Sequence, residues 1–276
     1  PDMRRTVRGA SALLAAGMLA VGLGACGDDD DEADAGSEAE ANDLAAGAAS
    51  DGGEFCDAAV AVDAASLGLD SGESSPDDID QALTTAEDSA PEEIADAVGT
   101  MVTEGRAMMA EAEATAEEEG PPPMPSDEFY PASVAVGGYL SDSCDFETLD
   151  VTATNYQFDG FSETVPAGTT VLNFTNDGTE FHEVALVQIA EGEERSLEEL
   201  MALPEEESDA LVTEKGFVFT PPGAQSYTTA DLDPGRYVAI CFVPVGATPE
   251  ALASGAALNE EDGHFMHGMV AEFEVA

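Results

Sequence analysis

The sequence predicts an α+β protein made of a small helical bundle followed by an all-β sandwich. Between residues 54 and 146, apolar residues recur at the spacing of amphipathic helices. From about residue 149, short alternating segments are instead separated by turn-forming Gly, Pro, Asn and Asp, as in a sandwich or barrel. The chain has 276 residues, of which 43% are hydrophobic, so it has the length of about two domains and can bury their cores.

The charge balance excludes one class of partner. The chain has 59 Asp and Glu against 7 Lys and Arg, which gives a net charge of −52. Proteins bind nucleic acid through clustered Lys and Arg, which displace the counterions of the phosphates. We therefore expect no nucleic-acid partner. The acidity is interpreted as a solvated surface, which fits either salty surroundings or a compositional bias of the whole proteome.

The N-terminus has the pattern of an export signal, predicted over residues 1–25. Three arginines precede an apolar run from residue 10 to about 23, which is too short to span a bilayer as a helix. The run ends in Leu-Gly-Ala-Cys at residues 23–26, which resembles the lipobox of bacterial lipoproteins. That resemblance implies lipidation of Cys26 and anchoring on the outer face of the cytoplasmic membrane. The alternative is a plain signal peptide with a chance cysteine.

Residues 26–53 are predicted to be an acidic, disordered tether. Asp, Glu, Ala and Gly dominate this segment and no hydrophobic period is present. It cannot bury enough apolar surface to offset the entropy lost on ordering. A flexible chain of this length reaches on the order of 30 Å.

Residues 54–146 are predicted to form the helical domain. Ser75, followed by Pro76, has the pattern of an N-cap with proline in the first turn. Ser89 with Glu92 three residues later resembles a capping box. A Pro-rich break at residues 121–125 ends the long helix after it, and a short helix is expected from about residue 131 to 140.

Sulfur-containing residues of this domain have structural interpretations. Met101, Met108 and Met109 lie on the apolar stripe of the long helix, which favours core packing over metal binding. Cys56 opens the domain and Cys144 closes it, so an exported protein is expected to join them in a disulfide.

Residues 147–276 are predicted to form the sandwich, with six to eight strands. Turn sequences lie at residues 166–168, 176–178 and 233–235. The expected strands include residues 151–154, 170–174, 184–187, 217–219, 236–240 and 270–275.

Four soft-metal donors lie at the ends of these strands. His182 opens a strand, Cys241 ends one, and His264 and Met269 lie just before the last one. An early imidazole, followed near the C-terminus by a thiolate, an imidazole and a thioether in that order, is the ligand set of a blue-copper site. Taken alone, each residue also has a structural interpretation, as a strand-edge or loop histidine or as a small buried hydrophobe.

The segment from about residue 149 to 276 resembles a cupredoxin of the plastocyanin and azurin type. This resemblance implies a Greek-key sandwich that holds one mononuclear copper ion, with His182, Cys241 and His264 as equatorial ligands and Met269 as the axial one. The matching motifs are Pro166-Ala167-Gly168, Asn176-Asp177-Gly178 before Phe181-His182-Glu183-Val184, Gly235-Arg236-Tyr237 before Cys241, and residues 264–270.

The chain departs from that family in three places. Twenty-two residues separate Cys241 from His264, where the family has only a few, and we expect this loop to loosen the ligand frame. The loop includes an expected helical turn at residues 248–252. Glu183 stands where the family often has Asn, and an insertion at residues 191–215 carries an amphipathic helix.

Met266 and His267 lie between the last two predicted ligands and are also soft donors. The patch resembles the His/Met sites of copper-delivery proteins, so these two residues are alternative metal ligands. His267 could also replace His264, provide an exposed path for electrons, or be an ordinary loop histidine.

The predicted function is that of a lipid-anchored blue copper protein outside the cytoplasm, which carries single electrons between redox partners by cycling Cu(I) and Cu(II). The acidic surface favours a redox protein with a basic docking patch. No enzyme is expected, because four fixed ligands leave no position for substrate and no Gly-x-Ser-x-Gly or His-Glu-x-x-His motif is present. The alternatives are a copper delivery or storage protein and a metal-free binding module.

Overall fold

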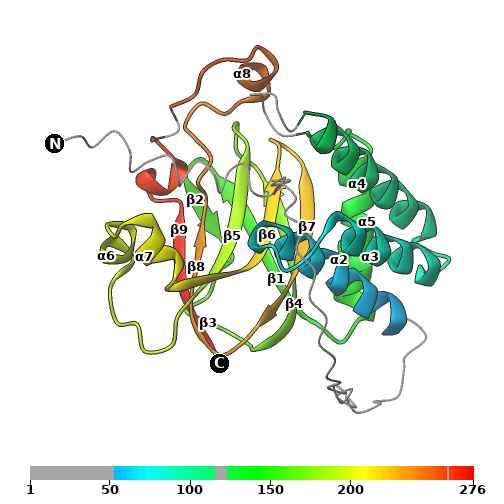
Figure 1. The fold of residues 1–276 in the computed structure, drawn as a ribbon, viewed down its shortest axis with the longest axis horizontal. Coiled ribbons are helices and arrows are strands. Elements are labelled where there is room, and N and C mark those ends of the chain that lie inside the picture. Colours follow the sequence, from blue (N-terminus) through cyan, green and yellow to red (C-terminus); the bar gives the residue numbers. More distant parts are fainter. Residues whose placement is uncertain (1–52, 116–122, 260) are drawn as a thin grey trace, which may run out of the picture.

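The computed structural model describes residues 53–115, 123–259 and 261–276. The predicted signal peptide, the lipobox Cys26 and the predicted tether lie outside these residues, apart from Gly53. Within the described part, the helices of the first half flank one side of a β-sandwich formed by the second half (Figure 1). The predicted order of a helical bundle followed by a β-sandwich is therefore confirmed.

Four helices form the helical bundle in the part of the chain that the structure describes. They are α2 (Gly53–Ser71), α3 (Pro76–Ser89), α4 (Ala95–Thr115) and α5 (Phe129–Ser143). Their apolar faces enclose one core, which contains Phe55, Leu83, Val98, Val102 and Leu140. Met101 and Met109 pack against this core, as the helical spacing predicts for core-filling methionines.

The two predicted helix caps have different outcomes. Ser75 caps α3 through a complete capping box with Asp78, so this cap is confirmed. The capping box at Ser89 is wrong, because Ser89 is the last residue of α3 and its hydroxyl donates to the Thr85 carbonyl at 2.6 Å. Ala90 then takes an extended backbone conformation, which is the conformation favoured before a proline.

A disulfide joins Cys56 to Cys144 across 88 positions of sequence, with the two Cα atoms 5.9 Å apart. It links the first turns of α2 to the residue after α5, and thereby closes the bundle at the point where the chain enters the sandwich. The predicted pairing is confirmed.

The sandwich consists of two mixed sheets. One has the order β2-β1-β4-β7 and contains β1 (Glu147–Thr154), β2 (Gln157–Asp159), β4 (Gly168–Asn176) and β7 (Gln225–Leu232). The other has the order β3-β9-β8-β5-β6 and contains β3 (Thr164–Val165), β5 (His182–Ile189), β6 (Val212–Thr220), β8 (Gly235–Ile240) and β9 (Val270–Val275). The β1–β4 and β3–β9 pairs are parallel and the others are antiparallel.

Alternate residues of the strands fill the space between the sheets, as the period of two predicts. Leu172, Phe174, Leu186 and Phe273 belong to this inner core. The opposite face of the five-stranded sheet is covered by α6 (Leu197–Met201), whose Leu200 is buried there, and α7 (Glu205–Asp209) follows it. The amphipathic helix predicted in the insertion is therefore present.

All six expected strands are found, and three further strands are present. β2 and β3 are very short. β7 is long, but its sequence is polar. Its outer face is covered by α2 and α5, which bury residues such as Thr229. A polar strand beneath a helix lacks the alternation by which a half-buried strand is recognised.

The helical bundle packs closely against strands β4 and β7 of the four-stranded sheet. A Cβ atom at Gly137 of α5 would lie 3.0 Å from both the Asn173 Oδ1 and the Tyr227 Cβ atoms. On α2, the Asp63 carboxylate accepts hydrogen bonds from the Thr229 backbone N–H and hydroxyl, both at 2.7 Å. Close backbone approach and a part-buried polar contact therefore hold the two parts together.

We expect Asp63 to make the stability of the protein depend on pH. Burial raises the pKa of its carboxyl group to about 6, although the Thr229 hydrogen bonds oppose this. The folded state therefore binds more protons than the unfolded state between about pH 4 and 6, and the Asp63 contribution to stability falls as pH rises through that window. The full loss is about 3 kcal/mol. Denaturant unfolding of the wild type and Asp63→Asn at several pH values measures it, and parallel pH profiles would contradict the expectation.

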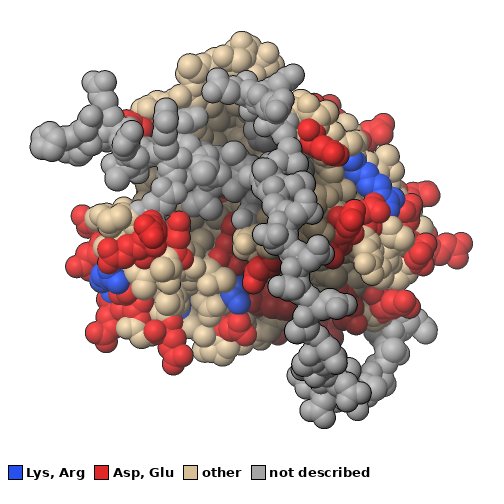
Figure 2. All heavy atoms as spheres, viewed as in Figure 1, with Lys and Arg blue, Asp and Glu red and all other residues tan. Residues whose placement is uncertain are grey.

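No helix of the described residues is long and apolar enough to cross a membrane. Asp and Glu are spread over the visible face of the molecule, while Lys and Arg are sparse (Figure 2). Each Lys and Arg of the described residues is paired with a carboxylate: Arg106 with Asp80, Arg195 with Glu193, Lys215 with Asp233 and Arg236 with Glu272.

Candidate metal centre

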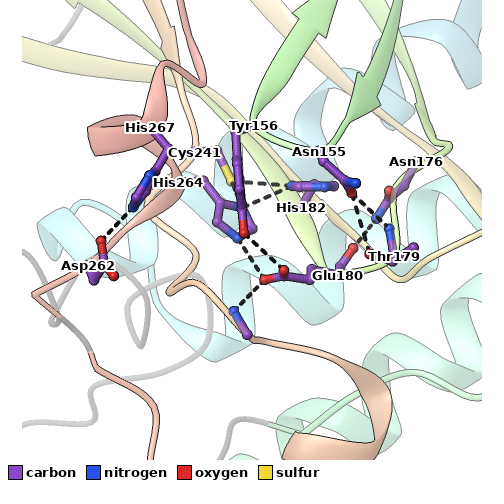
Figure 3. A network of polar contacts seen from close by, with 11 residues as sticks. Asn155, Tyr156, Asn176, Thr179, Glu180, His182, Cys241, Asp262, His264 and His267 are labelled. Carbon is purple, nitrogen blue, oxygen red and sulfur yellow. Dashed lines mark hydrogen bonds and ion pairs between the residues drawn. The ribbon is translucent and has the colours of Figure 1, made fainter.

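Three predicted ligands meet at one end of the sandwich. The ligand atoms of His182, Cys241 and His264 all lie within 4.8 Å of one another (Figure 3). The two Nδ1 atoms are 3.0 Å apart, and the Cys241 Sγ atom lies 3.4 Å from His264 Nδ1 and 4.0 Å from His182 Nδ1. None of the three residues has any exposed surface. The chain therefore encloses two imidazoles and a thiol around a common point.

The turn before β5 places His182. Asn176 is fully buried, and its side-chain amide donates to the carbonyls of Glu180 at 2.9 Å and Thr220 at 2.8 Å. The side-chain oxygen Oδ1 of Asn176 accepts a hydrogen bond from the Gly178 N–H at 2.9 Å. A Cβ atom at Gly178 would lie only 2.6 Å from His182 Nε2, so glycine lets the turn cover that edge of the imidazole. The Asn-Asp-Gly sequence thus positions the first ligand as well as forming a turn.

Backbone hydrogen bonds connect the other predicted ligands. The Cys241 N–H donates to the Met269 carbonyl at 3.3 Å, and the Met269 N–H donates to the His264 carbonyl at 3.2 Å. His264 lies in the short 3-10 helix η1 (His264–His267). Met269 is fully buried in the sandwich core. The axial role of Met269 stays a prediction, whereas its place beside the other ligands is set by the backbone.

The long loop between Cys241 and His264 is pinned at its base, contrary to the expectation that it would loosen the ligand frame. The His264 N–H donates to the Val243 carbonyl at 2.9 Å, and the Val245 N–H donates to the Asp262 carbonyl at 2.9 Å. The extra residues, including α8 (Pro249–Ala253) with its expected helical turn, therefore project beyond the ligands without separating them.

Glu180 fixes the orientation of His264. Its Oε2 atom lies 3.1 Å from His264 Nε2 and accepts from the Gly246 N–H, while its Oε1 atom accepts from the Tyr156 hydroxyl at 3.1 Å (Figure 3). Burial alone raises the pKa of Glu180, but these hydrogen bonds outweigh it and hold the pKa below its ordinary value. With Nε2 bound to a carboxylate, Nδ1 faces Cys241 and His182. Sequence reasoning missed Glu180, although an acid two residues before a predicted ligand is a usable signal.

We expect Glu180→Gln to weaken copper binding by about 10- to 100-fold, the usual cost of removing the partner of a ligating imidazole. The amide cannot supply the negative charge that holds His264 and increases its basicity. Titration against a copper chelator of known affinity measures the change. Asp177→Asn is the matched control, because Asp177 is an exposed acid in the same loop. Equal affinities for Glu180→Gln and the control would contradict the role given to Glu180.

Glu183 joins the strands of two ligands. Its Oε1 atom accepts from the Phe242 N–H at 2.8 Å, which links the residue after His182 to the residue after Cys241. Burial raises the pKa of this carboxyl group to about 8. Its Oε2 atom has no hydrogen-bond partner among the described residues. Glu183 therefore makes a strand-to-strand link next to the ligands.

Burial also determines the charges of the ligands. It lowers the pKa of His182 to about 4 and the pKa of His264 below its ordinary value, so both imidazoles are neutral and can bind a metal. Burial, together with the nearby Glu183, raises the pKa of the Cys241 thiol well above its ordinary value. A thiolate at this place therefore needs a compensating cation.

The donor set fits copper. Two imidazole nitrogens and one thiolate sulfur suit both Cu(I) and Cu(II), and a trigonal His₂Cys set with a weak axial Met is typical of electron-transfer copper sites. The two alternative ligands lie outside the three-residue cluster. Met266 is 61% exposed, and the His267 side chain is 42% exposed and lies 2.6 Å from Asp262 Oδ1 through its Nε2 atom.

No protein-family model matches the chain, and no curated protein matches it in sequence. Solved structures are similar to part of it. A dithionite-reduced auracyanin from the photosynthetic bacterium Roseiflexus castenholzii is 23% identical, with a TM-score of 0.30, and the match covers 47% of this chain and 96% of that one. Auracyanin A, a "blue" copper protein from Chloroflexus aurantiacus, is 21% identical, with a TM-score of 0.24 and coverages of 47% and 98%.

Rusticyanin from Thiobacillus ferrooxidans is 16% identical, with a TM-score of 0.28 and coverages of 47% of this chain and 78% of that chain. The solved structures similar to this chain thus include a protein described as a "blue" copper protein, and the described residues carry the His, Cys, His and Met set typical of a mononuclear copper site.

Proposed function

We propose that this chain is a membrane-anchored blue copper protein that carries single electrons between redox partners outside the cytoplasm. The observation that carries the proposal is the convergence of His182, Cys241 and His264 in a fully buried site, with Met269 bonded to the same backbone network. A copper ion bound there would supply one-electron chemistry, because it can alternate between Cu(I) and Cu(II) on these donors.

The surrounding residues suit electron transfer better than catalysis. All four predicted ligands are buried in a packed core, so the chain excludes both water and a substrate from the metal. Glu180 holds the His264 imidazole, and Glu183 and the backbone bonds hold the strands beside Cys241. A frame with these constraints keeps the donors in place when the charge of the site changes by one, which electron transfer requires.

The surface charge supports a basic redox partner. The described Lys and Arg are all engaged by carboxylates, which leaves a large excess of negative charge at the surface. Such a surface steers a positively charged partner and makes association weaken with salt. The location outside the cytoplasm is supported by the Cys56–Cys144 disulfide, since disulfides persist in oxidising compartments. Anchoring through lipid on Cys26 belongs to the same proposal.

A copper titration tests the function. One equivalent of Cu(II) added to the purified protein should produce an intense visible absorption band of thiolate-to-copper charge transfer, and ascorbate should bleach it. Copper bound without this band, or no copper bound at all, would contradict the electron-carrier proposal.

A copper delivery protein is the second candidate. Met266 is largely exposed and lies beside the exposed His267, so the loop presents soft donors at the surface. This candidate requires tight Cu(I) binding, rapid transfer to a chelator and no stable coloured Cu(II) form. A melting temperature unaffected by either copper ion would instead favour a metal-free binding module.

A further inference from the structure

The predicted copper site has no ligand at the surface. His182, Cys241, His264 and Met269 all have an exposed fraction of zero. An electron carrier with such a site must exchange electrons through the side chains that cover it. Because electron tunnelling weakens steeply with distance and across gaps, closely packed side chains between a ligand and solvent are the relevant feature.

Tyr156 lies against the His264 imidazole on its outward side. The two ring centroids are 4.8 Å apart, and the Tyr156 hydroxyl donates to Glu180, the same carboxylate that contacts His264 Nε2 (Figure 3). The tyrosine is thus connected to this ligand in two ways, by ring packing and through a shared carboxylate.

Tyr156 also contacts a second imidazole, which is exposed. The Tyr156 and His267 ring centroids are 5.2 Å apart, and the planes are inclined by 37°. The His267 side chain is 42% exposed, and the contact between its Nε2 and Asp262 Oδ1 at 2.6 Å holds it in place. The Tyr156 and His264 planes are inclined by 55°, so the rings of His264, Tyr156 and His267 form a continuous series of tilted ring contacts from the buried site to the surface.

The backbone conformation at Tyr156 is unusual. Its φ angle is +61°, and it is the one non-glycine residue with positive φ in the part of the chain that the structure describes. This region disfavours residues with a bulky side chain, and such strain is concentrated at functional positions. Glycine or asparagine would suit the turn between β1 and β2 better. The aromatic residue therefore occupies this turn at a cost in backbone conformational energy.

We propose that Tyr156 and His267 form the route by which electrons pass between the buried site and a partner protein, a deepening that rests on the proposed electron-carrier function. The partner is a one-electron redox protein with a positively charged surface, which docks over His267 and Asp262. One electron moves from the reduced to the oxidised protein through these ring contacts, and either protein can be the donor. No bond forms or breaks, and no proton is transferred.

The other covering side offers a different route. The Gly178 backbone covers the Nε2 edge of His182. Among the described residues, the one ring contact of His182 is with the buried His264, and no aromatic ring joins His182 to an exposed imidazole. Phe181, the residue before His182, is buried and stacks on Phe219 with centroids 5.2 Å apart. The Tyr156 side therefore offers electrons the better-connected route to the surface. The Gly178 side is the alternative route, and an experiment must distinguish the two.

The chain itself provides a specific labelling site for that experiment. It has three histidines, of which His182 and His264 are fully buried, so a pentaammineruthenium complex can attach to His267 alone. Flash photolysis of the label then gives the rate of electron transfer from ruthenium to the copper-loaded site within one molecule. We expect Tyr156→Leu to slow this transfer severalfold and Tyr156→Phe to leave it nearly unchanged, because phenylalanine keeps the ring.

A relocated label provides the control. The double variant His267→Gln, Asp177→His moves the ruthenium complex to an exposed position of the turn before β5. From this label Tyr156→Leu should not change the transfer rate. A Tyr156→Leu rate equal to wild type with the label on His267, or an equal slowing from both labels, would overturn the proposed route.

Two further measurements separate a failed route from a failed fold or function. The nuclear magnetic resonance signals of the His267 ring protons in the metal-free protein should shift when Tyr156 is replaced by Leu, because the ring current of tyrosine is lost. Absence of that shift would show that the Tyr156–His267 ring contact does not exist in solution. A protein without the charge-transfer band contradicts the proposed function itself, whereas a normal band and potential with unchanged transfer rates contradict only the route.

Discussion

Replacing Cys241 with Ser is expected to abolish the intense visible band of the copper-loaded protein. The band arises from charge transfer between a thiolate and Cu(II), and Cys241 is the one free cysteine of the described residues. A serine hydroxyl stays protonated at this place and gives no such transition. Visible spectra of both proteins with one equivalent of Cu(II) check the expectation, and a persistent band would exclude Cys241 as a ligand.

The fold of this variant must be checked separately, because Cys241 is fully buried in the sandwich core. A buried hydroxyl without a partner destabilises a protein by about 1–3 kcal/mol. Cooperative unfolding of metal-free Cys241→Ser, at a denaturant concentration somewhat below that of the wild type, would show that lost colour reflects the lost ligand. As a control, Asp177→Asn alters an exposed residue of the turn before β5 and should keep the full band.

Removal of the Cys56–Cys144 disulfide is expected to lower the free energy of unfolding by about 4.6 kcal/mol, the chain-entropy value for closing a loop of this length. The bridge spans 88 positions and encloses all four helices of the bundle. Since the total stability of a domain is about 5–15 kcal/mol, the bundle of Cys56→Ser, Cys144→Ser should unfold at much lower denaturant concentration.

The visible copper band of the same double variant should respond to denaturant differently from its helical signal. The ligands belong to the core between the two sheets, which is separate from the core of the helical bundle. We therefore expect the helical circular dichroism signal to be lost at lower denaturant while the copper band persists. The helical signal of metal-free wild-type protein under reducing conditions should respond to denaturant like that of the double variant. Equal stability of the oxidised wild type and the double variant would contradict a stabilising role for the bridge.

The chain order of the donors made the candidate site predictable. His182 opens a strand, Cys241 directly follows one and Met269 directly precedes one, so local patterns place them at strand ends. Strand ends on one side of a sandwich meet in space, and His264 lies five residues before Met269 in sequence. The three side chains of the cluster could therefore be chosen without coordinates. The disulfide was predictable for a similar reason, because its cysteines flank the helical segment.

Residues that surround the ligands were not predictable in the same way. Tyr156 has no distinguishing local pattern, and Glu180 is marked only as an acid two residues before a predicted ligand. The roles of both arise because a turn, a loop and a strand end meet around His264. The capping box at Ser89 failed because a local motif was interpreted without Pro91, which ends α3 early. The polar strand β7 was missed because the helices that bury it lie more than eighty residues away in the sequence.

The sequence by itself determined the two-part architecture, the disulfide partners and the donor set, because each depends on periodicity or on residue type at strand ends. The tertiary structure decided which acid orients His264, that the long loop is closed at its base, and that all the predicted ligands are buried, with Tyr156 packed against His264. These features depend on contacts between segments far apart in the chain, and such contacts form only when the sheets pack together.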